Sequence, residues 1–150
     1  MDKDKQWSEE LQKILIEEKI NLEITNKSLS GETTGGGLSR LERVLDNSKP
    51  SYILIELGGN DALRGYPPAK IKNNIEQMIN LSIKRGIKVF LMQIRILPNY
   101  GKRYQSSFES IYQDVAEENS ISLIPFMLND IALNQDLMLD DGIHPNVSAQ

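Results

Sequence analysis

The chain of 150 residues contains no cysteine and a single histidine, His144. The lack of cysteine excludes a disulfide, a thiolate zinc site and a cysteine nucleophile. The single histidine excludes metal sites built from several histidines, and it leaves His144 as the one imidazole that could act as an acid or base. We therefore expect no metal and no other cofactor, and we regard His144 as a directly testable residue.

Long apolar runs and basic clusters are also scarce. No apolar run approaches the roughly 18 residues of a membrane-spanning helix, and the first ten residues are mostly charged where a signal peptide needs an apolar core. The net charge is -4, and the densest basic cluster, Lys102-Arg103, is two residues long. Because phosphate binding needs a clustered basic face, we expect no nucleic-acid partner. Because no long apolar run occurs, we expect no integral membrane segment.

Helix-type and strand-type hydrophobic patterns alternate along the chain. Charged residues make up 25% and hydrophobic residues 39% of the sequence, as in a globular domain. Apolar residues at helical spacing predict helices over residues 5–19, 38–49, 68–85 and 104–115. Apolar runs predict strands over residues 22–24, 52–57, 87–94 and 121–124. The nearly continuous apolar run at 52–57 is typical of a strand that is buried on both faces.

The alternation of strands and helices predicts an α/β fold. We expect helices to cover a mostly parallel sheet, with right-handed crossovers between strands. No linker, repeat or low-complexity tract divides the sequence, so we expect one domain over residues 1–150. Ligands of such sheets bind beyond the carboxyl ends of the strands, and a site is therefore expected in the loops there.

Two of these loops offer groups that could hold an oxyanion. Residues 58–61 follow the most apolar predicted strand, and Asn60 could present its side-chain NH₂ there. Gly31, in the loop over residues 26–37, could offer a backbone N–H that no side chain obstructs. Each residue type is also common in ordinary turns. The glycine-rich run 31–37 matches neither the dinucleotide-binding nor the P-loop spacing, which makes a nucleotide site a poor interpretation.

A third loop contains the only histidine. Asp141 precedes His144 by three residues, and the intervening Gly142 allows a turn through which the carboxylate could accept the imidazole Nδ1–H. The Nε2 atom would then be available as a general base. Asp140 is an alternative partner for the imidazole. The competing interpretation is an exposed turn in which the histidine has no role.

The order and content of these loops resemble the SGNH (GDSL-type) hydrolase superfamily, most closely its bacterial esterase, thioesterase and lysophospholipase branch. Residues 26–33 resemble the family's second block, residues 56–65 its third and residues 141–146 its fifth. Residues 92–101 also resemble this branch, in a loop that borders its acyl-binding groove.

The resemblance implies a three-layer α/β/α sandwich with a flavodoxin-like sheet and a Ser-His-Asp ester or thioester hydrolase. It places Gly31 and Asn60 in the oxyanion hole, and Asp141 and His144 as the catalytic acid and base. The expected substrates are small acyl esters or acyl thioesters, and we expect a monomer. A periplasmic or secreted location is an expectation from the resemblance alone, since relatives often carry an N-terminal export signal.

One family motif does not occur in this sequence. The family's nucleophile is the serine of a G-D-S motif at the end of the first strand, and the 150 residues contain no G-D-S. Ser28 and Ser30 already occupy positions of the second block. We therefore expect that the first strand, with the nucleophile, and the last helix lie outside this chain, and that the chain as written folds poorly and is inactive. The alternative is a non-catalytic module that binds a small ligand, or a degenerate hydrolase.

Overall fold

The computed structural model describes residues 7–96, 100–128, 131, 135–137 and 146 of the chain. Its contacts divide the chain into two compact units. The larger unit comprises residues 29–127, and the smaller one comprises residues 1–28 and 128–150. The expectation of a single domain over residues 1–150 stays a prediction.

Three parallel strands form the sheet of the larger unit. They are β1 (Tyr52–Ile55), β2 (Lys88–Met92) and β3 (Ser122–Ile124), in the spatial order β1-β2-β3. Each lies within a strand predicted from the sequence and is shorter than the prediction. The register pairs Ile53 with Val89, so apolar side chains of neighbouring strands share one face of the sheet. The predicted parallel sheet is confirmed.

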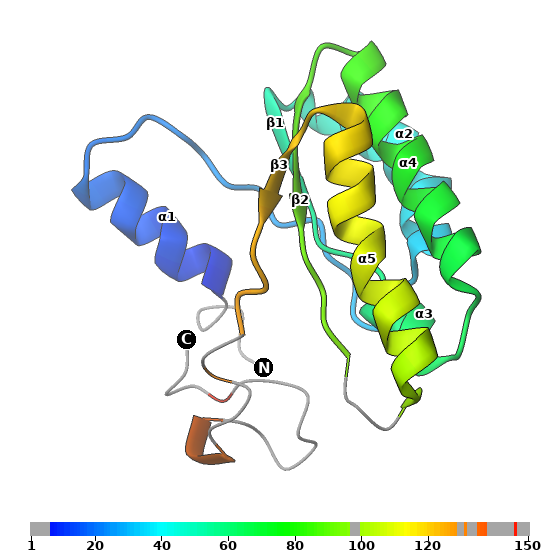
Figure 1. The fold of residues 1–150 in the computed structure, drawn as a ribbon. Coiled ribbons are helices and arrows are strands. Elements are labelled where there is room, and N and C mark those ends of the chain that lie inside the picture. Colours follow the sequence, from blue (N-terminus) through cyan, green and yellow to red (C-terminus); the bar gives the residue numbers. More distant parts are fainter. Residues whose placement is uncertain (1–6, 97–99, 129–130, 132–134, 138–145, 147–150) are drawn as a thin grey trace. The chain divides into compact units, whose positions relative to one another are not determined.

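Three long helices lie on one side of this sheet (Figure 1). They are α2 (Thr34–Ser48), α4 (Pro68–Lys84) and α5 (Lys102–Asn119). Pro68 begins α4, where a missing N–H is tolerated, and Gly86 follows the end of α4 with a φ of +72°. The buried core of the unit consists of Leu41, Leu45, Ile55, Ala62, Ile71, Ile75, Met78, Ile79, Ile87, Val89, Leu91, Phe108, Ile111, Tyr112 and Val115.

Two segments of the larger unit are helical where the sequence predicts a loop. Residues 34–37 form the first turn of α2, and the Thr33 side chain caps this turn by accepting a hydrogen bond from the Gly36 N–H. A Cβ at Gly37 would lie 2.5 Å from Leu57 Cδ1. Gly37 therefore allows α2 to pack closely against Leu57, and it does not form a turn. The second segment is α3 (Gly59–Leu63), a short helix after β1.

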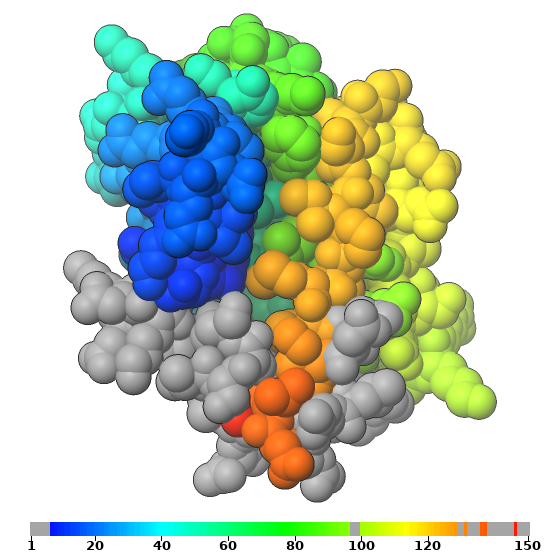
Figure 2. Space-filling model, turned by 90° about the vertical axis from the view of Figure 1, so that its left-hand side faces the viewer, coloured from blue at the N-terminus to red at the C-terminus, as the bar shows by residue number. Residues whose placement is uncertain are grey.

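The prediction that β1 is buried on both faces is wrong for one face. The side chains of Tyr52 and Leu54 are 50% and 36% exposed, whereas Ile55 in the core is 4% exposed. The three long helices of this unit cover the face that contains Ile55 (Figure 1). No strand among the described residues pairs with the outer edge of β1. At the other edge, β3 and the residues after it, in orange, lie at the surface (Figure 2).

The smaller unit contains α1 (Trp7–Glu17) and a 3-10 turn, η3 (Gln135–Leu137). The strand predicted over residues 22–24 is wrong. The side chain of Gln12 donates a hydrogen bond to the Leu22 carbonyl (3.1 Å) and accepts one from the Ile24 N–H (2.7 Å). These backbone groups therefore bond to a side chain of α1 where a strand would need them for pairing. In the described part of the chain, no helix is long and apolar enough to cross a membrane.

Candidate active site

Two segments of the larger unit contain the oxyanion residues predicted from the sequence. Gly31 lies in the loop before α2, and Asn60 is the second residue of α3. The α3 helix is the next element after β1 and lies at the end of the sheet where the strands terminate (Figure 1). Parallel sheets bind ligands at this end. The structure thus places both predicted residues in one compact unit, with Asn60 at the expected edge of the sheet.

Gly31 is an exposed glycine in the left-handed region, with a φ of +73°. A Cβ built here would meet no atom within 4 Å, so the backbone conformation and not the available space favours glycine. The Gly31 N–H donates no hydrogen bond within the residues that the structure describes. It is therefore available to an acceptor. The carbonyl oxygen of Gly31, in contrast, accepts a hydrogen bond from Arg64 Nη2 at 3.2 Å.

A sharp turn between β1 and α3 sets the position of Asn60. Gly58 has a φ of +123°, and a Cβ there would lie 2.2 Å from the Tyr112 hydroxyl. That hydroxyl donates a hydrogen bond to the Leu57 carbonyl oxygen at 3.0 Å. Asn60 is half-buried, and its side-chain amide makes no hydrogen bond with the described residues. Among the described residues, the Asn60 NH₂ is therefore an unused donor, as the Gly31 N–H is.

Two tyrosines of α5 bond to the chain on either side of α3. Tyr112 bonds to Leu57 before α3, and the Tyr104 hydroxyl donates to the Tyr66 carbonyl oxygen after it, at 2.6 Å. Phe108 lies between the two rings, with its centroid 6.5 Å from that of Tyr104 and 5.5 Å from that of Tyr112. Burial, with the negative charge of Asp61, raises the pKa of both tyrosines. Both hydroxyls therefore keep their protons and act as donors.

Asp61 connects α3 to the first residue of α2. Its carboxylate accepts hydrogen bonds from the Thr34 N–H (2.8 Å) and from the Thr34 hydroxyl (2.6 Å). The Thr34 hydroxyl in turn accepts a bond from Asn74 Nδ2 of α4 at 3.0 Å. These side chains are buried, with 1%, 0% and 8% of Asp61, Thr34 and Asn74 exposed. The loop with Gly31 and the helix with Asn60 are thus joined through a buried polar network.

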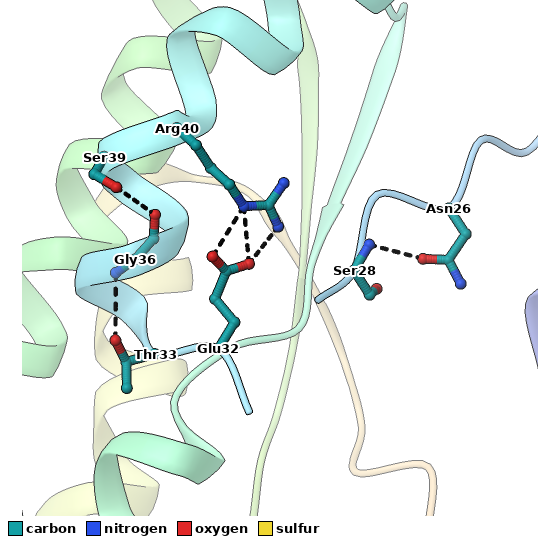
Figure 3. A network of polar contacts seen from close by, with 7 residues as sticks. All are labelled: Asn26, Ser28, Glu32, Thr33, Gly36, Ser39 and Arg40. Atoms are coloured by element: carbon teal, nitrogen blue, oxygen red, sulfur yellow. Dashed lines mark hydrogen bonds and ion pairs between the residues drawn. The ribbon is translucent and has the colours of Figure 1, made fainter. Parts of the chain in front are cut away.

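Further contacts hold the Gly31 loop to α2 (Figure 3). The Glu32 carboxylate forms an ion pair with Arg40, and Arg40 Nε lies 2.9 Å from each carboxylate oxygen. The Thr33 hydroxyl accepts from the Gly36 N–H at 3.3 Å. The two residues after Gly31 are therefore both anchored to the helix that follows them.

The network of Asp61, Thr34 and Asn74 was missed by the sequence reasoning. The sequence offers one signal for it, an aspartate directly after Asn60 at the end of an apolar strand. Nothing in the sequence indicates that this aspartate is paired with a threonine 27 residues earlier. That pairing depends on how α2 and α3 pack, which is a tertiary property.

The predicted acid Asp141, the base His144 and the alternative acid Asp140 lie outside the described residues. Their pairing stays a prediction. Within the residues that are described, no group of three or more histidine, aspartate or glutamate side chains could hold a metal ion.

An open hollow of about 510 Å³ lies at the start of α5. Tyr104, which bonds to the chain after α3, forms part of its wall. The hollow is lined by Pro68, Tyr100, Gly101, Lys102, Arg103, Tyr104 and Ser107. Tyr100 and Gly101 belong to the segment 92–101, in which the sequence resembles a loop bordering an acyl-binding groove.

Comparison with known proteins gives matches over nearly the whole chain. Residues 2–150 match the GDSL-like Lipase/Acylhydrolase family. An arylesterase of Vibrio mimicus is 45% identical over 147 residues, which are 98% of this chain and 74% of that protein. The thioesterase 1/protease 1/lysophospholipase L1 of Escherichia coli K12 is 41% identical over 127 residues, which are 85% of this chain and 61% of that protein.

A solved structure shows the same fold. The psychrotrophic esterase EstA from Pseudoalteromonas sp., in a structure inhibited by monoethylphosphonate, superposes with a TM-score of 0.97 at 39% identity. The match covers 100% of this chain and 82% of the EstA chain. The predicted α/β sandwich is confirmed by this likeness.

Proposed function

The chain belongs to the GDSL-like lipase/acylhydrolase family, and from this membership we propose that it supplies the oxyanion hole and the general base of an ester and thioester hydrolase. One observation in the structure supports the proposal above the others. The Gly31 N–H and the Asn60 amide, two donors with no bond among the described residues, lie on segments that a buried network joins. A pair of fixed, unused donors suits the negative oxygen of a tetrahedral intermediate.

The proposed reaction is acyl transfer through a serine. The serine hydroxyl attacks the acyl carbonyl carbon as His144 Nε2 takes its proton, and Asp141 keeps the imidazole oriented through Nδ1–H. The carbonyl oxygen becomes an oxyanion that accepts bonds from Gly31 N–H and Asn60 Nδ2. His144 then gives the proton to the leaving alcohol or thiol. Water then attacks the acyl carbon and gives a proton to His144; the bond to the serine oxygen breaks, that oxygen takes the proton back from His144, and the acyl group leaves as a carboxylic acid.

The serine of this scheme is not among residues 1–150, which contain no G-D-S motif. Ser28 and Ser30 are excluded because the family resemblance places them in its second block. The outer edge of β1, which no described strand occupies, offers a place for a further parallel strand. A strand paired there would end at the same edge of the sheet as α3. We therefore expect negligible ester hydrolysis by residues 1–150 alone.

A complemented chain tests the proposal. It consists of residues 1–150 joined to the parts of the Vibrio mimicus arylesterase that lie outside the match, which covers 74% of that protein. From the family resemblance, we expect these parts to supply the G-D-S serine and the last helix. We expect it to hydrolyse p-nitrophenyl butyrate and an acyl-CoA, and to react with a fluorophosphonate. His144→Ala should abolish turnover, and Asn60→Ala should lower kcat about 100- to 1000-fold, the usual loss for one oxyanion donor.

Two controls make the result specific. Replacing the serine of G-D-S by alanine should abolish both turnover and fluorophosphonate labelling. Ser82→Ala removes a buried hydroxyl that bonds to the Met78 carbonyl oxygen within α4 (2.8 Å), and it should leave kcat unchanged. A folded complemented chain that hydrolyses neither substrate would contradict the proposal and favour a non-catalytic module that binds small ligands.

We also propose that the active protein is a monomer located outside the cytoplasm. The expectation of location comes from the family resemblance. Expression from the native gene with its own flanking sequence, followed by cell fractionation and by light scattering of the purified protein, tests both statements. Recovery in the cytoplasm or as a stable dimer would contradict them.

A further inference from the structure

We propose that Asp61 is a positioning residue that fixes the Gly31 N–H and the Asn60 amide relative to each other. In its kinetic part, this inference rests on the proposed hydrolase function. Asp61 follows Asn60 directly in α3 and bonds to Thr34, three residues after Gly31. A displacement of Asp61 would therefore alter the spacing of the two donors.

Asp61 holds Thr34 at two points. One carboxylate oxygen accepts from the Thr34 backbone N–H and the other from the Thr34 hydroxyl. Two bonds to one residue determine its orientation as well as its distance, and both residues are at most 1% exposed. Thr34 is the first residue of α2, where the positive end of the helix dipole favours a carboxylate. The contact is thus favourable electrostatically as well as geometrically.

Asn74 determines which way the Thr34 hydroxyl points. Its Nδ2 atom donates to Thr34 Oγ1 at 3.0 Å. Because an amide NH₂ can only donate, the hydroxyl must accept this bond and direct its own hydrogen to Asp61. Asn74 belongs to α4 and is 8% exposed. Side chains from α2, α3 and α4 therefore fix a single hydrogen-bonding arrangement between Thr34 and Asp61.

A second contact joins the same two segments. Arg64, three residues after Asp61, donates to the carbonyl oxygen of Gly31, three residues before Thr34. Residues three apart lie on the same side of a helical turn. Asp61 in α3 thus contacts the first residue of α2, and Arg64, directly after α3, contacts the Gly31 loop. Two points of contact oppose rotation of α3, which would move Asn60 away from Gly31.

Positions of oxyanion donors matter within a fraction of an ångström. Donors act when they lie about 2.7–3.1 Å from the oxyanion, and a misplacement of about 1 Å can cost about 100-fold in rate. In the complemented chain, we expect Asp61→Asn to lower kcat about 10- to 100-fold and to change KM less than about threefold. The oxyanion exists only after the attack, so the ground-state complex should be little affected.

A double-mutant cycle with Asn60→Ala separates positioning from a general loss of stability. If Asp61 acts by placing the oxyanion donors, Asp61→Asn should cost much less activity in a protein that already lacks the Asn60 amide. The matched control is Ser82→Ala, which should leave kcat unchanged both with and without the Asn60 amide. Thr34→Ser, which keeps the hydroxyl, should retain activity, and Thr34→Val should lose it about as strongly as Asp61→Asn.

A second measurement does not depend on turnover. In ¹H–¹⁵N spectra of the complemented chain, Asp61→Asn should shift the Gly31 backbone amide and the Asn60 side-chain amide, and Ser82→Ala should shift neither. Unchanged Gly31 and Asn60 resonances, or equal losses from Asp61→Asn with and without Asn60, would overturn the role of Asp61. A folded complemented chain without turnover would overturn the hydrolase function and leave the resonance test to decide on Asp61.

Discussion

Replacing Gly58 by alanine should be among the most damaging single methyl additions in the larger unit. Gly58 has a φ of +123°, outside the regions that side chains readily adopt, and such strain costs about 1–3 kcal/mol. The added Cβ would also lie 2.2 Å from the Tyr112 hydroxyl, which is buried in the core. Relieving an overpacked core contact costs a further amount of about 1–3 kcal/mol. We therefore expect Gly58→Ala to lower the free energy of unfolding by about 2–6 kcal/mol.

Urea unfolding of the complemented chain, followed by circular dichroism, measures this loss. Gly86→Ala is the matched control, because Gly86 has a φ of +72° and a Cβ there would meet no atom within 4 Å. The control should lower the free energy of unfolding only by the cost of the left-handed backbone conformation, about 1–2 kcal/mol. Tyr112→Phe removes the hydroxyl that the new Cβ would strike. The nearest remaining atoms would then lie 3.5 and 3.6 Å away, at ordinary contact distances.

Tyr112→Phe should therefore cost less in the Gly58→Ala background than alone, by about 1 kcal/mol or more. In the parent it removes the hydrogen bond to Leu57, whereas in the variant it also relieves the clash. Strictly additive losses, or a Gly58→Ala variant as stable as Gly86→Ala, would refute the view that Tyr112 and Gly58 together form the turn before Asn60.

Two other predictions concern stability. Glu32→Gln removes the ion pair between Glu32, whose side chain is 9% exposed, and Arg40, whose side chain is 21% exposed. We expect it to lower the free energy of unfolding by about 1–3 kcal/mol, between the values for exposed and buried pairs. An unchanged midpoint in the same urea assay would contradict this expectation. Residues 1–150 alone should unfold over a broad temperature range and at a lower midpoint than the complemented chain. The reason is that, in the described part of the chain, β1 has an unpaired edge and exposed apolar residues. A sharp transition at the same temperature would contradict this expectation.

Local patterns in the sequence predict the larger elements well. Pro68 and Gly86 are located at the two ends of α4, and the apolar repeat of α5 leads directly to the core positions Phe108 and Tyr112. These elements can be predicted because their boundaries and buried faces depend on residues within the element.

The features that the sequence did not predict depend on residues far away in the chain. Residues 22–24 are apolar enough for a strand, but Gln12 occupies their backbone groups. The first turn of α2 contains three glycines, and one of them is required by Leu57 of another segment. The same holds for the candidate site. Gly31 and Asn60 were found through motifs, whereas the Asp61 and Thr34 contact that joins their segments has no local signature.

The most direct test of the proposed active site is a crystal structure of the complemented chain with a phosphonate bound covalently to the G-D-S serine. The phosphonyl oxygen stands in for the oxyanion of the tetrahedral intermediate. It is predicted to lie about 2.7–3.1 Å from both Gly31 N and Asn60 Nδ2, with His144 within hydrogen-bond reach of the serine oxygen. A phosphonyl oxygen that contacts neither Gly31 nor Asn60 would contradict the proposed oxyanion hole.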